Sequence, residues 1–119
     1  MFEQADIRAH VVALEGEWDL SRGDELRRRL EPACERARVI VDLSGVTYID
    51  SNCLSMLVRM RTKRVAKGYR PEILVIPSGN IKKIFTGTGF DHLWTIAGSM
   101  DEALGLLKYS GNSAVSAMT

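Results

Sequence analysis

The chain has 119 residues, which is the size of one ordinary domain. Hydrophobic residues make up 45% of it and charged residues 26%, a composition typical of a folded globular protein and not of a disordered one. The 16 Lys and Arg residues nearly balance the 15 Asp and Glu residues, and the net charge is +1. The chain therefore lacks the basic excess of a nucleic-acid-binding protein, and we expect no nucleic-acid partner.

The cysteines and the hydropathy pattern limit the possibilities further. Cys34 and Cys53 lie outside any C-x-x-C pattern, so they predict neither a disulfide framework nor a metal site. The N-terminus lacks a signal-peptide pattern, and no apolar run approaches the roughly 18 residues of a membrane span. We therefore expect a cytoplasmic protein with reduced thiols, no cofactor and no insertion into a membrane.

The first half of the chain predicts a strand, a helix and a second strand. Side chains alternate over residues 7–18, and this alternation predicts an extended segment. Apolar residues recur at helical spacing over about 22–36 and predict a helix with one buried stripe. Residues 39–43 form a nearly continuous apolar run, which is typical of a central strand covered on both faces. Residues 44–50 are expected to connect this strand to the next helix.

The second half repeats the alternation. Residues 51–67 predict a long helix that Gly68 ends in a left-handed cap, and residues 73–76 predict another buried strand. The remaining predicted elements are a short helix, an edge strand and a last helix, at about 79–86, 93–96 and 100–108. This order predicts an α/β domain over residues 1–108, with a mixed, mostly parallel sheet of four to five strands and about four flanking helices. Residues 109–119 are expected to form a flexible tail.

No catalytic constellation is visible in the sequence. His10 and His92 have no partner serine or cysteine at a known nucleophile turn, and no G-x-S-x-G motif is present. The segment Gly87-Thr88-Gly89 resembles part of a phosphate-binding loop, but no Gly-Lys-Ser/Thr follows it, and a helix C-cap explains both glycines better. The sequence therefore predicts a protein that is not an enzyme, and a small nucleotide-binding or nucleotide-hydrolysing domain stays an alternative.

The segment from residue 42 to residue 54 carries the most functional information. A buried strand ends there, and Asp50 and Ser51 lead directly into the long helix. We expect Ser51 at the N-cap or in the first turn, where its hydroxyl lies near unpaired backbone N–H groups. Plain capping explains a serine at this position, but it does not explain the composition of the helix that follows.

Helical spacing divides the residues of this helix between a core face and an opposite face. The expected core residues are Leu54, Leu57, Val58 and Val65, and the residues expected on the opposite side are Cys53, Met56 and Met60. Exposed methionines offer adaptable apolar surface that often binds partners. Met56 is expected to be the more exposed of the two, since a flanking helix could cover Met60. A helix N-terminus can lower the pKa of a thiol, but packing as a small apolar side chain is the favoured interpretation of Cys53.

Three segments of the chain resemble a known family. Residues 39–57 contain a strand, a D-L-S-x-V pattern and an I-D-S start of a helix, and they resemble the signature of STAS domains, within them that of bacterial anti-sigma factor antagonists. Residues 14–19 are similar to the turn after the family's early strand, and residues 81–90 resemble its late helix and glycine segment. The resemblance extends over residues of about 7–108, in the expected order.

The resemblance implies a function in regulating sigma-dependent transcription. Unphosphorylated, such a protein binds an anti-sigma factor that is itself a serine kinase, and phosphorylation releases it. By resemblance, Ser51 matches the phosphorylated serine, and Asp19 matches the acidic residue that kinase recognition needs. Asn52 and Cys53 stand where the family has a second hydroxyl residue and a glycine, which leaves Ser51 as the only hydroxyl at the helix start. A serine phosphatase that resets the switch is implied by the family.

A phosphate adds roughly −1.5 to −2 charges at pH 7, and at an interface that closes over Asp19 and Asp50 it would meet like charge. Phosphorylation is therefore expected to weaken partner binding. The residues expected to bind the partner are Asp19, Asp50, Asn52, Cys53, Met56 and Met60. The alternative within the family is a STAS-domain subunit of another regulatory or transport-linked assembly, in which Ser51 is not phosphorylated. The sequence leaves the oligomeric state open.

Overall fold

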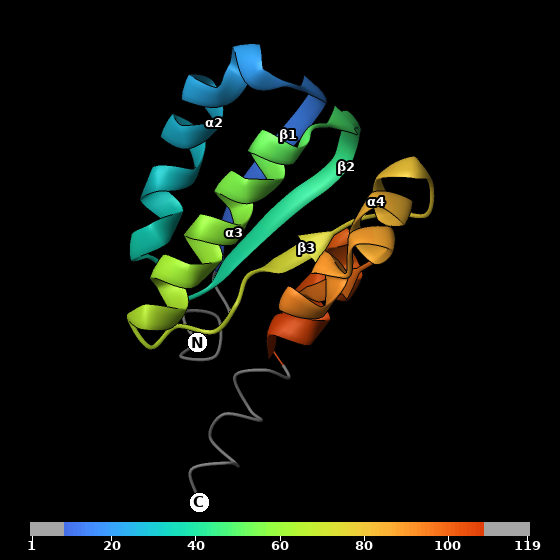
Figure 1. The fold of residues 1–119 in the computed structure, drawn as a ribbon. Helices are drawn as coiled ribbons and strands as arrows, with labels where there is room; N and C mark the ends of the chain where they lie inside the picture. The colour runs from blue at the N-terminus through green and yellow to red at the C-terminus, as the bar shows by residue number, and fades with distance from the viewer. Residues whose placement is uncertain (1–8, 109–119) are drawn as a thin grey trace, which may run out of the picture.

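The computed structural model describes residues 9–108, which form a four-stranded sheet with helices on both faces (Figure 1). The strands are β1 (His10–Trp18), β2 (Val39–Ile49), β3 (Ile73–Val75) and β4 (Thr95–Ala97). They lie in the order β1-β2-β3-β4, and each neighbouring pair is parallel. The predicted α/β class is confirmed. Residues 7 and 8 of the predicted first strand and the predicted tail at 109–119 lie outside the described residues.

The helices follow the predicted order, with one correction. The α-helices are α2 (Gly23–Leu30), α3 (Ser51–Ala66), α4 (Asn80–Thr88) and a last helix at 100–108. The 3-10 segments are η1 (Leu20–Arg22), η2 (Glu31–Glu35) and η3 (Phe90–Leu93). The prediction of one helix over 22–36 is wrong, because the α-helical pattern ends at Leu30 and Pro32, which has no backbone N–H, lies in the 3-10 turn that follows.

Alternate residues of the central strands enter two separate cores, as successive side chains of a strand must. The larger core contains Val39, Val41, Leu43, Leu74 and Ile76, together with residues of α2, α3 and α4. The smaller core contains Ile40, Ile73, Val75 and Ala97, together with Ala103 and Leu107 of the last helix. Helices α2 and α3 therefore pack on one face of the sheet, and the last helix packs on the other. None of the helices within residues 9–108 is long and apolar enough to cross a membrane.

The strand β2 is longer than predicted. Residues 44–50 were expected to be a connection, but β2 continues to Ile49 and pairs with β1 up to Trp18. The pairing shifts register twice, and Gly16 adopts a positive φ of 85° beside these shifts. These irregularities let the long strand follow β1 without a regular alternation of buried and exposed side chains. As a result, β1 and β2 end side by side at one edge of the sheet (Figure 1).

The two ends of α3 are held by different contacts. Asp50 caps the first turn, and Gly68, with a φ of 90°, follows the last turn as predicted. Within the helix, Leu54 and Leu57 are buried as expected, whereas the prediction that Val65 belongs to the core face is wrong, since it is 41% exposed. Its neighbour Arg64 is buried instead.

Arg64 is fully buried at the C-terminal end of α3 and forms an ion pair with the equally buried Glu72 at 2.6 Å. The guanidinium makes five hydrogen bonds, one to this carboxylate and four to backbone carbonyls of residues that precede β2 and β3. The second carboxylate oxygen of Glu72 accepts a hydrogen bond from the Trp94 indole at 3.1 Å. This network ties the end of α3 to three other segments of the chain.

Candidate functional site

The candidate site lies where β1 and β2 end and α3 begins. The backbone N–H of Asp50 donates to the carbonyl of Trp18 at 3.0 Å, so the residue before α3 is joined to the end of β1. The turn that follows β1, with Asp19 and η1, therefore lies beside the first turn of α3. The structure brings together the two segments that the sequence singled out, although 30 residues separate Asp19 from Asp50.

Asp50, and not Ser51, is the N-cap of α3. Its carboxylate accepts a hydrogen bond from the backbone N–H of Cys53 at 2.9 Å, as a capping carboxylate does. Ser51 is the first residue of the helix and is exposed. Its side chain makes no hydrogen bond with any of residues 9–108, while its carbonyl accepts one from the Ser55 hydroxyl at 2.9 Å. The Ser51 hydroxyl is thus accessible, and capping does not occupy it.

Asp19 also caps a helical segment, in the turn that follows β1. Its carboxylate accepts hydrogen bonds from the backbone N–H and the hydroxyl of Ser21, and it caps η1. These hydrogen bonds hold the pKa of Asp19 below its usual value, with a smaller contribution from the positive charge of Arg22. Asp19 is therefore a fixed negative charge at neutral pH. It lies half-buried beside the start of α3, where it was predicted to contribute to partner recognition.

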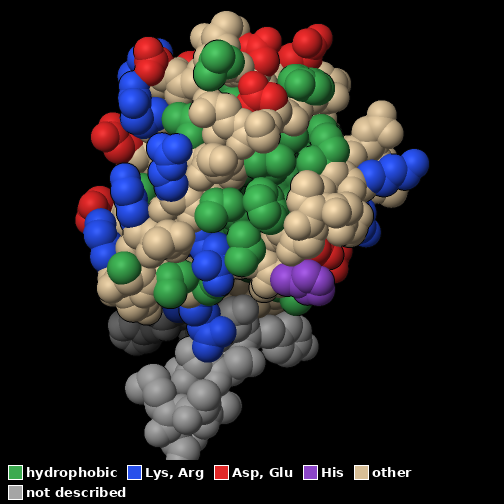
Figure 2. All heavy atoms as spheres, in the orientation of Figure 1, with side chains coloured by type: hydrophobic (Ala, Val, Ile, Leu, Met, Phe, Trp, Pro, Cys, Tyr) green, Lys and Arg blue, Asp and Glu red, His purple; other side chains and the backbone are tan. Residues whose placement is uncertain are grey.

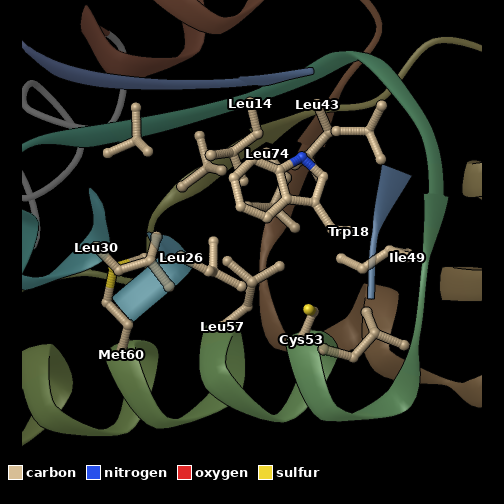
Figure 3. Close-up of a cluster of buried hydrophobic side chains, with 14 of the residues drawn as sticks. Leu14, Trp18, Leu26, Leu30, Leu43, Ile49, Cys53, Leu57, Met60 and Leu74 are labelled. Carbon is tan, nitrogen blue, oxygen red and sulfur yellow. The ribbon is translucent and has the colours of Figure 1, made fainter. Parts of the chain in front are cut away.

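Cys53 is buried in the core, and its predicted place on a partner-facing side is wrong. Its thiol points into the hydrophobic cluster near Ile49 and Leu57 (Figure 3) and donates to the carbonyl of Asp19 at a sulfur–oxygen distance of 3.6 Å. Burial, followed by the nearby carboxylate of Asp50, raises the pKa of Cys53 to about 12. The thiol is therefore protonated at neutral pH, and the favoured interpretation, a small apolar side chain in the core, is confirmed.

The two methionines differ in exposure because α2 covers one of them more than the other. Met60 is 2% exposed and lies against Leu30 of α2 (Figure 3), so a flanking helix covers it, as the sequence allowed, and it offers no surface to a partner. Met56 is half-buried and remains at the surface between α2 and α3. Asn52 is also half-buried, and a Cβ on Gly23 would lie 3.6 Å from its side-chain nitrogen, so it abuts the start of α2.

Two exposed apolar residues that lie close in sequence to Asp19 and Asp50 were not predicted. Leu20, directly after Asp19, is 73% exposed, and Tyr48, two residues before Asp50, is 48% exposed. Exposed large side chains of this kind often mark a contact surface when they cluster. A signal for Tyr48 was available, since it alternates with the buried Ile49, but it requires β2 to continue past residue 43.

Arg22 stabilises the turn that contains Asp19 through contacts with an aromatic ring, a carboxylate and two backbone carbonyls. Its guanidinium lies 3.5 Å from the centre of the Trp18 ring and forms two hydrogen bonds with the carboxylate of Glu25. The same group donates to the carbonyls of Glu15 and Glu17. The end of β1, η1 and the start of α2 are therefore linked through one side chain, which keeps this side of the site in place.

The other candidate sites gain no support. The segment Gly87-Thr88-Gly89 is the last turn of α4 and its left-handed cap, with φ of 78° at Gly89, so it is not a free phosphate-binding loop. Within residues 9–108, no group of three or more His, Cys, Asp or Glu side chains could hold a metal ion.

Comparisons with known proteins agree with this architecture. A family model described as "Mlab, STAS domain" matches residues 1–97. The STAS-domain containing protein PA14_20770 of Pseudomonas aeruginosa is 30% identical over 95 residues, which cover 78% of this chain and 92% of that protein.

Three solved structures share the fold. An anti-sigma factor antagonist from Mycobacterium paratuberculosis has a TM-score of 0.72 at 20% identity, covering 84% of this chain and 86% of that one. The Bacillus cell fate determinant SpoIIAA in its phosphorylated form has a TM-score of 0.59 at 21% identity, covering 78% and 86%. A sulfate transporter family protein from Wolinella succinogenes has a TM-score of 0.68 at 19% identity, covering 85% of each chain.

Proposed function

Since the chain belongs to the STAS domain family, we propose that it is an anti-sigma factor antagonist controlled by phosphorylation of Ser51. Unphosphorylated, it binds an anti-sigma factor that is a serine kinase, and this frees the sigma factor for transcription. Phosphorylated, it releases the kinase, and a serine phosphatase returns it to the binding form. We place the protein in the cytoplasm, where all of these partners would be.

The observation that carries this proposal is the accessible hydroxyl at the first residue of a 16-residue helix, which makes no hydrogen bond within the described residues. Because Asp50 supplies the cap, Ser51 can be modified without removing a contact that holds the helix start. Ser55 and Thr62 lie further along the same helix, and each donates its hydroxyl to a carbonyl one turn earlier. These two hydroxyls are therefore poorer phosphate acceptors than Ser51.

The physical effect of a phosphate at Ser51 is different for the fold and for an interface. The N-terminal end of a helix carries partial positive charge, so it tolerates an added anion, and we expect the fold to persist. The flanking carboxylates of Asp19 and Asp50 are already negative, and a partner that buries this edge would have to desolvate all three groups together. Binding would weaken for this reason, while the unphosphorylated edge offers the exposed apolar surface of Leu20 and Tyr48.

The experiment is phosphorylation by the kinase that co-purifies with the chain from its native cell. With ATP, the protein should gain one phosphate on Ser51, as mapped by mass spectrometry, and Ser51→Ala should gain none. Ser55→Ala is the matched control, since it removes an exposed hydroxyl one turn away, and it should be phosphorylated like the wild type. Phosphate on Ser55 or Thr62, or normal phosphorylation of Ser51→Ala, would contradict the proposal.

A second candidate is favoured by the shared fold of the sulfate transporter family protein, and it is a STAS-domain subunit of a transport-linked assembly. In that case the same edge of the sheet would bind a transporter component, and Ser51 would carry no phosphate. Purification of the chain with its bound partners from native cells separates the two. A serine kinase in the complex supports the first function, and a transporter component without a kinase supports the second.

A further inference from the structure

A groove runs between α2 with η2 on one side and α3 on the other. Its floor is apolar, its rim is charged, and its cavity volume is about 100 Å³. The floor residues are Leu30, Cys34, Met56 and Met60, and the rim residues are Arg27, Glu31, Arg59 and Lys63. In Figure 2, Lys and Arg side chains gather over this part of the molecule, on the left of the view.

The rim is positively charged. Arg59 and Lys63 lie one turn apart on α3, both are exposed, and neither forms an ion pair with any of residues 9–108. Arg27 is paired with Asp24 of its own helix, and among residues 9–108 Glu31 is the only acidic residue that lines the groove. Two cations on one rim that have no ion-pair partner within the described part of the chain would therefore attract a negatively charged partner.

The size and shape of the cavity indicate what could enter it. A volume of about 100 Å³ is smaller than the roughly 150 Å³ cavity that holds a benzene molecule, so it fits one apolar side chain. The floor includes the flexible side chain of Met56, which can adjust to the shape that enters. A concave apolar site of this size suits a side chain that projects from a helix, whereas a flat membrane surface would need protruding apolar side chains on this face.

We propose that this groove docks an acidic amphipathic helix of a protein partner. One apolar side chain of that helix enters the cavity, and Asp or Glu residues beside it face Arg59 and Lys63, which is the helix-in-groove form of recognition. The groove lies on the same helix as Ser51, with Met56 five residues further along. The inference rests on the proposed function only in treating the chain as a protein-binding module, and it does not require phosphorylation.

The test uses two synthetic peptides of about 18 residues, since shorter helices are marginal in water. Both carry the same apolar face of Leu and Ala, and the polar face is Glu in one and Lys in the other. Binding to the full chain is measured by fluorescence anisotropy. We expect the Glu peptide to bind at least about tenfold more tightly than the Lys peptide, and to lose affinity as salt is raised, because salt screens exposed charges.

The test variant carries Arg59→Glu and Lys63→Glu together. The matched control carries Lys82→Glu and Lys83→Glu, which reverses the charge of two exposed side chains on α4, away from the groove. The first pair should weaken binding of the Glu peptide at least about tenfold, and the second should change it by less than about twofold. Met56→Glu should weaken it as well, and circular dichroism checks that each variant is folded.

Equal affinity for the two peptides, or equal losses in the two double variants, would overturn the inference. So would binding of vesicles of anionic phospholipid that depends on Arg59 and Lys63 when the Glu peptide does not bind. None of these measurements involves a kinase. Failure here would therefore leave the Ser51 proposal in place, and failure of phosphorylation would leave the groove in place.

Discussion

The two ends of α3 hold their polar groups in opposite ways. At the C-terminal end, Arg64 is fully buried, and its five hydrogen bonds and its ion pair with Glu72 satisfy the whole guanidinium. At the N-terminal end, Ser51 is exposed and its hydroxyl is unbonded within the described residues, because Asp50 provides the cap. A buried, fully bonded charge cannot change without a large cost, whereas an exposed hydroxyl can gain a charge and leave the fold intact.

The largest effect should come from breaking the buried end. Arg64→Met leaves the carboxylate of Glu72 buried without its cation, and losing one partner of such a pair costs about 3–5 kcal/mol. The free energy of unfolding, measured by urea denaturation, should fall by that amount. Lys63→Met is the control, since this neighbouring side chain is exposed and should change stability by less than about 0.5 kcal/mol. Equal stability of the two variants would refute the structural role of the network.

The next largest effect should be a difference in alkylation rate between the two thiols. Burial raises the pKa of the Cys53 thiol to about 12, whereas Cys34 is half-buried in the groove. In the native protein at pH 8, iodoacetamide should modify Cys34 at least about tenfold faster than Cys53. In urea, where both are exposed, the rates should become similar. Modification of native Cys53 at the rate of Cys34 would mean that the start of α3 opens more readily than its packing suggests.

A smaller difference in the free energy of unfolding should separate a variant of Asp50 from a variant of Ser51. Asp50→Ala removes the carboxylate that accepts from the backbone N–H of Cys53, and the loss of a cap costs about 0.5–2 kcal/mol. Ser51→Ala removes no hydrogen bond among residues 9–108, and it should stay within about 0.5 kcal/mol of the wild type. Both values can be read from the same urea titrations. The reverse order would make Ser51 the structural residue and weaken its assignment as a modification site.

The smallest effect concerns Asp19 and acid. Hydrogen bonds from Ser21 lower the pKa of Asp19 in the folded protein, so its carboxylate stabilises the fold above the unfolded-state pKa. This contribution is lost as the pH falls through the folded-state pKa. Asp19→Asn should therefore lower the melting temperature slightly at pH 7, and the difference should shrink below about pH 4. A difference that grows in acid would contradict the direction of the shift.

Much of the fold could be predicted because its signals are local. The apolar run at 39–43 and the one at 73–76 predicted buried strands, and the structure pairs these two strands in parallel. The helix at 51–67 was predicted to within one residue at its C-terminal end. The extension of β2 to Ile49 could not be predicted in the same way, because pairing with an irregular β1 holds that segment extended and local hydropathy does not.

The sequence singled out two segments that the fold brings together, but it did not predict which of their side chains are exposed. Asp19, Asp50 and Ser51 meet at one edge of the sheet, as the resemblance implied. Helical spacing placed Cys53 and Met60 opposite the core residues of α3, and both are buried, Met60 by a flanking helix as the sequence allowed. Their burial depends on the end of β1 and on α2, which cover this side of α3. The periodicity of the helix alone does not show that other elements cover it.

The buried arginine illustrates the same limit. Helical spacing predicted Val65 on the core face of α3, but the neighbouring Arg64 is the buried residue. Arg64 can be buried because Glu72 and backbone carbonyl groups of distant segments accept hydrogen bonds from its guanidinium. These partners become neighbours only in the folded chain.

The most direct measurement compares the affinity of the anti-sigma factor kinase for two forms of the chain, unphosphorylated and fully phosphorylated on Ser51. Calorimetric titration of each form against the same kinase preparation, without ATP, gives the two dissociation constants. We predict that the phosphate weakens binding at least about tenfold, because it adds charge beside Asp19 and Asp50 at a surface that binding desolvates. Equal affinity of the two forms would contradict a switch at Ser51.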